Sequence, residues 1–261
     1  MLLEYPTRDR LRQLRLSAMV AELDRQQADP DRATLSFEDR LGLLVDAEWL
    51  ERSNRRLHRR LHEAHLRLVA TPEDIDWAAP RALPKPELRA LFTSRWVTAH
   101  QAVLLTGPTG VGKTFILCAL GHAACRADFR VRYYRLPRLF GEATLARTEG
   151  RWLTWLAGLA RLDLLLVDDW GLDPFTEEQS RELLEIVDDR YGLRATAIAS
   201  QTPLDQWHGL FPDPTVADAI LDRMVHQAHR LALQGESLRK TLSRPADRGT
   251  TEGESPESGG A

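Results

Sequence analysis

The residues best suited to chemistry form a short loop with the pattern G-x-x-x-x-G-K-[ST], directly after the apolar run 102–105. Its members are Gly107, Pro108, Thr109, Gly110, Val111, Gly112, Lys113 and Thr114. Glycines allow backbone N–H groups to turn inward as an anion nest, and the dipole of a following helix adds to the attraction for phosphate. Lys113 would reach the β- and γ-phosphates, and the Thr114 hydroxyl would ligate Mg²⁺. The loop therefore predicts a nucleoside triphosphate site, with ATP and Mg²⁺ as its ligands.

Two aspartates follow a second apolar run, residues 164–167. A buried parallel strand presents its last side chains at the carboxyl edge of the sheet, where α/β folds bind ligands. There Asp168 would hold Mg²⁺, and Asp169 would orient or deprotonate the attacking water. The alternative is an aspartate pair that caps the next helix. The phosphate loop favours the catalytic interpretation, because hydrolysis requires a carboxylate opposite it.

Polar side chains also end a third apolar run, 195–199. Either Ser200 or Gln201 could hydrogen-bond the γ-phosphate or the water and so report the nucleotide state. The alternative is an ordinary boundary between a strand and a turn, since Thr202-Pro203 follows.

Arg223 lies in a segment whose apolar residues, Ile220, Leu221, Met224 and Val225, bury one helix face. Arg223 would point elsewhere. An arginine supplied across a subunit interface to a neighbour's γ-phosphate would stabilise transition-state charge. The alternative is a surface ion pair with Asp222.

Short apolar runs alternate with amphipathic segments from residue 102 onward, which predicts an α/β fold with a parallel five-stranded sheet covered on both faces. The predicted strands are 102–106, 130–135, 163–168, 195–200 and 229–233. The predicted helices are 113–126, 137–147, 151–161, 176–191 and 215–227.

The flanking segments have different compositions. Residues 1–70 predict a small helical domain with two apolar stripes, the second formed by Phe37, Leu41, Leu44, Val45 and Leu50. Four prolines in 71–95 predict a stiff connector, which leaves 96–240 as the ATPase domain. Residues 241–261 are rich in Ser, Gly, Glu and Pro and predict a disordered tail.

A basic stretch, residues 51–67, contains six arginines and three histidines against two glutamates. A helix with this composition can follow DNA phosphates. The alternative is a solvated helix whose arginines pair with acids. No base-reading motif is evident, so the expected binding is to duplex DNA with tolerance of sequence. The candidate DNA contacts are Arg52, Arg55, Arg56, Arg59 and Arg60.

The order of these motifs resembles that of AAA+ ATPases, and more specifically the IstB-type transposition helper ATPases, close relatives of the DnaC-type helicase loaders. The resembling segments are 105–114, 131–139, 168–172, 213–226 and 235–240. The resemblance implies ATP hydrolysis, homo-oligomers that form on DNA in the ATP state, and help to a partner transposase in selecting target DNA. It also implies that Arg223 is a trans-acting arginine finger, that Arg239 is a second sensor, and that little or no C-terminal lid is present.

The sequence also bears on the rate of hydrolysis and on other possible functions. Asp169 stands where AAA+ proteins usually have glutamate, which suggests slow, regulatory hydrolysis. A replicative helicase loader is the alternative function, and a small-molecule kinase is disfavoured because no acceptor pocket or lid is evident.

The net charge of −3 restricts any nucleic-acid surface to a local patch. No signal peptide or long apolar run appears, so a cytoplasmic protein without membrane contact is expected. Cys118 and Cys125 are expected to be small buried residues.

Overall fold

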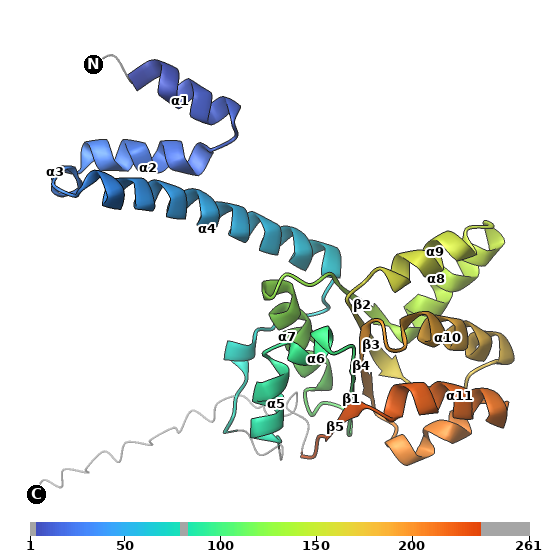
Figure 1. Ribbon diagram of the computed structural model, residues 1–261. Coiled ribbons are helices and arrows are strands. Elements are labelled where there is room, and N and C mark those ends of the chain that lie inside the picture. The colour runs from blue at the N-terminus through green and yellow to red at the C-terminus, as the bar shows by residue number, and fades with distance from the viewer. Residues whose placement is uncertain (1–3, 79–82, 236–261) are drawn as a thin grey trace, which may run out of the picture.

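The computed structural model describes residues 4–78 and 83–235 of the chain. Figure 1 shows a helical arm that projects from an α/β body. The arm contains α1 (Glu4–Gln13), α2 (Ser17–Ala28), α3 (Pro30–Ala33) and most of α4 (Phe37–Ala64). Arg239 and the predicted tail at 241–261 lie outside the described residues, as does the end of the chain where a lid would follow.

The body is built on a sheet of five parallel strands in the order β2-β3-β4-β1-β5. The strands are β1 (Ala102–Thr106), β2 (Val131–Arg135), β3 (Leu164–Trp170), β4 (Ala195–Ser200) and β5 (Ala228–Ala232). Every predicted strand ends within two residues of an observed one, so the predicted α/β class and five-stranded sheet are confirmed. The carboxyl ends of β1, β3 and β4 meet at one edge.

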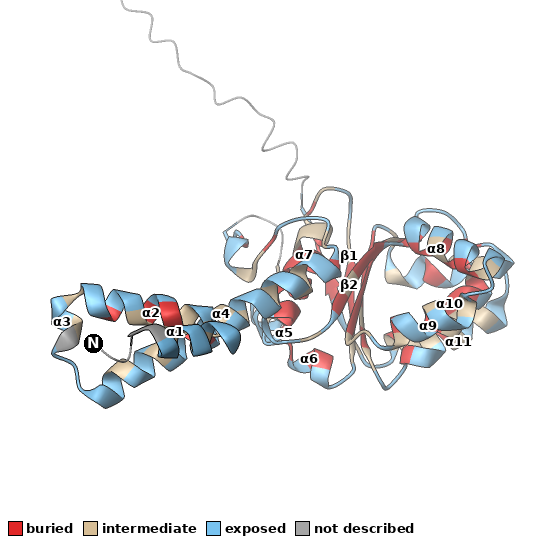
Figure 2. Cartoon of the chain, turned by 90° about the horizontal axis from the view of Figure 1, so that it is seen from above, coloured by how far each residue is buried: buried red, intermediate tan, exposed pale blue. Residues whose placement is uncertain are grey.

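Helices cover both faces of the sheet, which gives three layers (Figures 1 and 2). Alternate strand residues enter opposite cores: Val103 and Leu105 lie in one, and Leu104 lies in the other. The first core includes α5 (Lys85–Leu91), α6 (Arg95–Thr98) and α7 (Lys113–Arg126). The second includes α8 (Leu136–Thr148), α9 (Trp152–Ala160), α10 (Glu177–Arg190), the 3₁₀ segment η2 (Leu204–Leu210) and α11 (Pro214–Val225).

One long helix joins the arm to the body. Ser36 caps α4 by accepting a hydrogen bond from the N–H of Asp39. At the other end of α4, Ala64 is fully buried, and Leu57 and Leu61 pack against the core that contains α7. Halfway along, the carboxylate of Glu48 accepts hydrogen bonds from the N–H groups of Ala18 and Met19 at the start of α2. Because α2 has no side-chain cap of its own, Glu48 supplies one from the neighbouring helix.

The second predicted apolar stripe does not form a core. Phe37, Leu41, Val45 and Leu50 are exposed, and Phe37 is 73% exposed. Trp49 extends the same four-residue spacing and is 66% exposed. The stripe faces solvent because α2 packs on another side of α4, through Gln26 and Glu48.

The proline-rich segment also differs from the expected connector. Pro72 begins the 3₁₀ helix η1 (Pro72–Asp74), and Pro86 lies in the first turn of α5, where a missing N–H costs nothing. Leu88 and Leu91 of α5 are buried in the core with α7. This stretch is therefore part of the body. In the described part of the chain, no helix is both long and apolar enough to cross a membrane.

Candidate nucleotide-binding site

The phosphate loop, residues 107–114, turns sharply between β1 and α7. Gly107, Gly110 and Gly112 have φ angles of +145°, +86° and +98°, which favour glycine. A Cβ on Gly107 would lie 2.3 Å from the carbonyl oxygen of Leu233. Val111 is fully buried and anchors the loop in the core that contains α7. The fold therefore places this glycine-rich loop at the N-terminus of α7, where backbone N–H groups can bind an anion.

Lys113 lies across this loop. Its Nζ donates to the carbonyl oxygens of Gly107 at 2.7 Å and Pro108 at 2.8 Å, and the residue is only 8% exposed. Burial lowers the pKa of Lys113, and the charges of Asp168 and Asp169 oppose that shift. A cation held only by two carbonyl oxygens can turn toward a stronger anionic partner, such as a phosphate.

Thr114 and Asp168, the two predicted Mg²⁺ ligands, are in direct contact. The Thr114 hydroxyl donates to Asp168 Oδ2 at 2.7 Å, and the Tyr133 hydroxyl donates to the same oxygen at 2.8 Å. Hydroxyl and carboxylate oxygens suit Mg²⁺, which binds few protein groups and completes its shell with phosphates and water. Among the described residues no three His, Cys, Asp or Glu side chains gather as a metal site, so a metal here would also need nucleotide oxygens.

Asp169 lies in an irregular part of β3. Its φ is +60°, and the register between β3 and β4 shifts between Val167 and Trp170. This bulge turns consecutive carboxylates toward the same edge of the sheet, whereas a regular strand would place them on opposite faces. Both carboxylates line one cavity together with residues of the phosphate loop.

Two arginines accompany the carboxylates and were not predicted as members of this site. Arg135 Nε donates to Asp169 Oδ2 at 2.6 Å. Arg67 Nη1 lies 3.8 Å from Oδ2 of both Asp168 and Asp169. Arg135 ends β2, which neighbours β3, so strand order could have indicated it. No sequence signal indicates Arg67, because its position depends on how α4 docks.

The structure separates the two candidate sensors. Ser200 is fully buried; its hydroxyl donates to the Trp170 carbonyl and accepts from the N–H of Thr202. Gln201 instead accepts a hydrogen bond from the Thr109 hydroxyl of the phosphate loop. A cavity of about 360 Å³ brings Gln201 together with Arg67, Thr109, Lys113, Thr114, Asp168 and Asp169.

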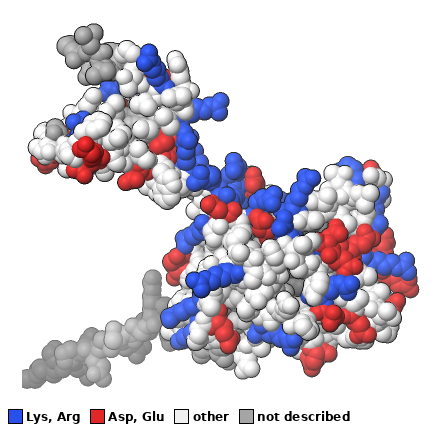
Figure 3. Space-filling model, viewed as in Figure 1, with Lys and Arg blue, Asp and Glu red and all other residues white. Residues whose placement is uncertain are grey.

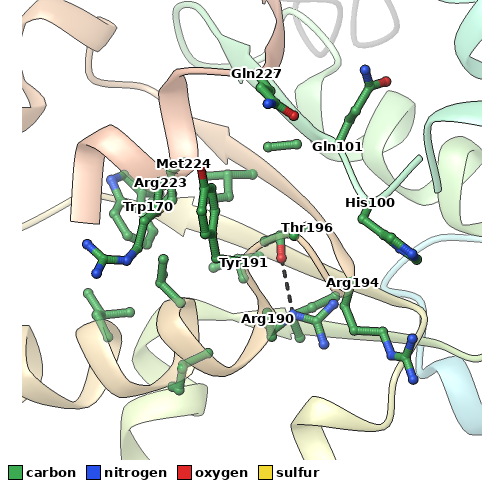
Figure 4. Close-up of a pocket in the computed structure, with 18 of the residues that line it drawn as sticks. His100, Gln101, Trp170, Arg190, Tyr191, Arg194, Thr196, Arg223, Met224 and Gln227 are labelled. Atoms are coloured by element: carbon green, nitrogen blue, oxygen red, sulfur yellow. Dashed lines mark hydrogen bonds between the residues drawn. The ribbon is translucent and has the colours of Figure 1, made fainter. Parts of the chain in front are cut away.

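Arg223 lies away from this cavity. Its Nε is 2.5 Å from Asp188 Oδ1 of α10, and its Nη1 donates to the Ala219 carbonyl. The ion pair is thus with Asp188, where the sequence alternative named Asp222. Arg223 lines a second cavity of about 250 Å³ beside Trp170 and Met224, between the sheet and helices α10 and α11 (Figure 4).

The candidate DNA contacts lie along α4, where basic side chains gather between arm and body (Figure 3). Four of the five pair with acids: Arg52 with Glu48, Arg55 with Glu51, Arg59 with Glu63 and Arg60 with Asp128. Arg56 donates to the Ser53 hydroxyl. The structure thus contains the acid pairs of the alternative interpretation. The pairs of Arg55 and Arg59 are exposed on both sides, and exposed pairs are weak, so these two arginines can exchange partners. Arg52 and Arg60 are held more firmly, because Glu48 and the Arg60 side chain are largely buried.

Comparison with known proteins gives one family over nearly the whole chain. The family described as IstB-like ATP binding protein matches residues 9–246. The chain is 44% identical over 243 residues to y4pL of Sinorhizobium fredii, named as an insertion sequence ATP-binding protein; the match covers 93% of this chain and 99% of that protein. An ATP-binding protein named for insertion sequence IS21 of Pseudomonas aeruginosa is 31% identical, with 91% and 88% covered.

Solved structures show the same fold at low identity. DnaI superposes with a TM-score of 0.54 at 19% identity, over 68% of this chain and 94% of that one. AMPPCP-bound DnaA from Aquifex aeolicus superposes with a TM-score of 0.55 at 19% identity, over 68% and 54%. The family match and the sequence relatives, joined to a phosphate loop set in a parallel five-stranded sheet, lead to one identification: this chain belongs to the IstB-like ATP binding proteins of insertion sequences.

Proposed function

We propose that this protein is a slow, Mg²⁺-dependent ATPase that assembles as a homo-oligomer on duplex DNA and helps a partner transposase select its target. The observation that carries the proposal is the direct contact of Thr114 with Asp168, because it joins the phosphate loop to the carboxylate strand. In this proposal the ATPase domain comprises residues 96–240 together with the stretch 71–95 that packs into the same core, and residues 1–70 bind DNA and the partner.

Each side chain of the site has a separate role in the proposed hydrolysis. Lys113 would leave the carbonyls of Gly107 and Pro108 for the β- and γ-phosphates, while the loop N–H groups hold their oxygens. Thr114 and Asp168 would hold Mg²⁺, which supplies charge neutralisation on the phosphates. Asp169 would accept a proton from the attacking water, and Gln201 would orient that water or the γ-phosphate.

Arg223 completes the proposed site from a neighbouring subunit. It is 31% exposed in its side chain and outside its own phosphate cavity, as an arginine supplied in trans must be. ATP would then stabilise the contact between two subunits. The insertion-sequence relatives support a transposition context, and the basic stretch of α4 supports contact with DNA phosphates.

Nucleotide binding and assembly test the proposal together. We expect wild-type protein to bind a fluorescent ATP analogue in Mg²⁺ and to form filaments or rings with duplex DNA under the electron microscope. Lys113→Ala should lose both, whereas Lys85→Ala, at an exposed lysine of α5, should retain both. Asp169→Asn and Arg223→Ala should still bind ATP but lower hydrolysis at least tenfold. Monomers of wild-type protein in every nucleotide state would contradict the assembly.

The transposase step needs its own assay. With the transposase encoded in the same insertion sequence, we expect strand transfer into target DNA to require this protein and ATP. The Lys113→Ala variant should not support strand transfer. Equal stimulation of a replicative helicase's loading onto DNA, with no effect on strand transfer, would favour the helicase-loader alternative.

A further inference from the structure

Arg67 reaches the ATP site from the N-terminal part of the chain. It follows the last residue of α4 by three positions, and its guanidinium lines the same cavity as Lys113 and Thr114. Nη1 lies at an equal 3.8 Å from Oδ2 of Asp168 and of Asp169. One cation therefore faces both carboxylates of the pair.

The carboxylate pair needs such a cation when no metal is bound. Asp168 is almost fully buried, and two adjacent carboxylates repel each other. Lys113 is turned to the loop carbonyls, and the close contact of Arg135 is with Asp169. Of the described basic residues, Arg67 is thus the one that forms an ion pair with both carboxylates.

We propose that Arg67 is a positioning residue of the ATP site that changes partners with nucleotide binding. Without nucleotide it neutralises Asp168 and Asp169; when a Mg²⁺ nucleotide occupies the cavity, it turns to the triphosphate. A divalent cation on Asp168 repels a guanidinium beside it, while the phosphate oxygens in the same cavity attract it. This inference rests on the proposed ATP site.

The surroundings of Arg67 allow its side chain to move while its backbone stays fixed. The side chain is 39% exposed. On one side Leu66 packs against the core, and on the other Ala70 is fully buried. The end of α4 is held as well, because Arg132 donates to the Glu63 carbonyl at 3.1 Å. The segment that follows α4 therefore lies between the attachment of the arm and the phosphate cavity, which it lines with Arg67 and Leu68.

Three variants separate charge from shape. Arg67→Gln removes the charge and keeps a polar side chain, Arg67→Lys keeps the charge, and Arg138→Ala removes an exposed arginine that pairs with Glu142 outside the cavity. The affinity for a fluorescent ATP analogue is measured with Mg²⁺ and with a chelator. Hydrogen exchange of residues 57–70 is followed with and without Mg²⁺-ATP.

We expect Arg67→Gln to weaken binding at least tenfold in chelator and by a clearly smaller factor in Mg²⁺. Without the metal, the variant loses both the neutralisation of the carboxylates and the contact with the triphosphate, whereas with the metal it loses only that contact. Arg67→Lys should restore most of the affinity, and Arg138→Ala should match wild type. Mg²⁺-ATP should slow exchange at 66–70 in wild type and not in Arg67→Gln.

Two results would overturn the inference. The first is a ratio of the affinity in Mg²⁺ to the affinity in chelator that differs by less than twofold between Arg67→Gln and wild type. The second is a change of this ratio in Arg138→Ala that is as large as the change in Arg67→Gln. If wild-type protein binds ATP and Arg67→Gln binds it with the same affinities, only the role of Arg67 is contradicted. Wild-type protein that binds no ATP contradicts the proposed function, and the role of Arg67 with it.

Discussion

Asp168 illustrates how one buried carboxylate can be prepared for a metal. Two hydroxyls, from Thr114 and Tyr133, donate to its Oδ2, and the N–H of Asp169 donates to its Oδ1. Burial, with the charge of Asp168 beside it, raises the pKa of Tyr133, so this phenol remains a donor at every physiological pH. Donors of this kind fix the orientation of the carboxylate.

Tyr133→Phe tests that arrangement. We expect the variant to fold but to lose about 1.5–3 kcal/mol of unfolding free energy, because a buried hydrogen bond to a charged acceptor is lost. Urea denaturation in Mg²⁺-free buffer measures the change. Tyr191→Phe, at an exposed ring on the other side of the sheet, should change stability by less than about 0.5 kcal/mol. Equal stability of Tyr133→Phe and wild type would count against a formed bond to Asp168.

Cys118 and Cys125 give a prediction of pH dependence. Both are buried on α7, and burial raises the pKa of both thiols, that of Cys125 to about 12. The thiolate is the reactive form, so we expect neither to react with a disulfide reagent in the folded protein at pH 8, and both to react in urea. Raising the pH to 9 should barely increase the native rate. A thiol that reacts natively at the rate of a free cysteine would contradict this burial.

At the scale of elements, the phosphate loop depends on a contact with the chain beyond β5. Gly107 approaches the backbone of Leu233 so closely that no side chain fits. The Leu233 N–H also donates to the Thr106 carbonyl at 2.8 Å, which extends the pairing of β5 with β1. The residue after β5 therefore sets the shape of a loop that lies far from it in sequence.

Substituting glycine at two sites tests this dependence. Gly107→Ala should destabilise the protein by about 1–3 kcal/mol and abolish ATP binding, because the loop must move away from Leu233. Gly141→Ala, inside α8 where a Cβ meets nothing within 4 Å, should stabilise by about 0.5–1 kcal/mol. Thermal unfolding and binding of the fluorescent analogue measure both. Retained ATP binding in Gly107→Ala would show that the loop adapts.

The local patterns that could be predicted from sequence are those whose geometry is set within a few residues. Apolar periodicity located the five strands and helices α7 to α11 of the body but missed α5 and α6. The loop and Asp168–Asp169 followed from strand ends. Interactions set by docking could not be predicted. The prolines of 71–95 indicated a connector, yet Leu88 is core; Phe37 indicated a buried stripe, yet it faces solvent; and Arg67 enters the site only because α4 packs on β2 and α7.

At the scale of the molecule, the basic surface lies where the arm meets the body. Triple charge reversal, Arg55→Glu, Arg56→Glu and Arg59→Glu, should lower affinity for duplex DNA and reduce the slope of log affinity against log salt by about 2–3, since each lost phosphate contact removes about 0.9. Arg181→Glu, at an exposed arginine of α10, should change neither. An unchanged slope in the triple variant would leave α4 as a solvated helix.

The continuity of α4 has a mechanical consequence. Its 28 residues run without a break, at about 1.5 Å per residue, so the helix is a rod of about 42 Å with one end clamped in the body. A tilt of about 10° at the clamped end displaces the free end by about 7 Å. Small adjustments near the base of this rod are thereby converted into large movements at its tip, where the exposed ring of Phe37 is carried along.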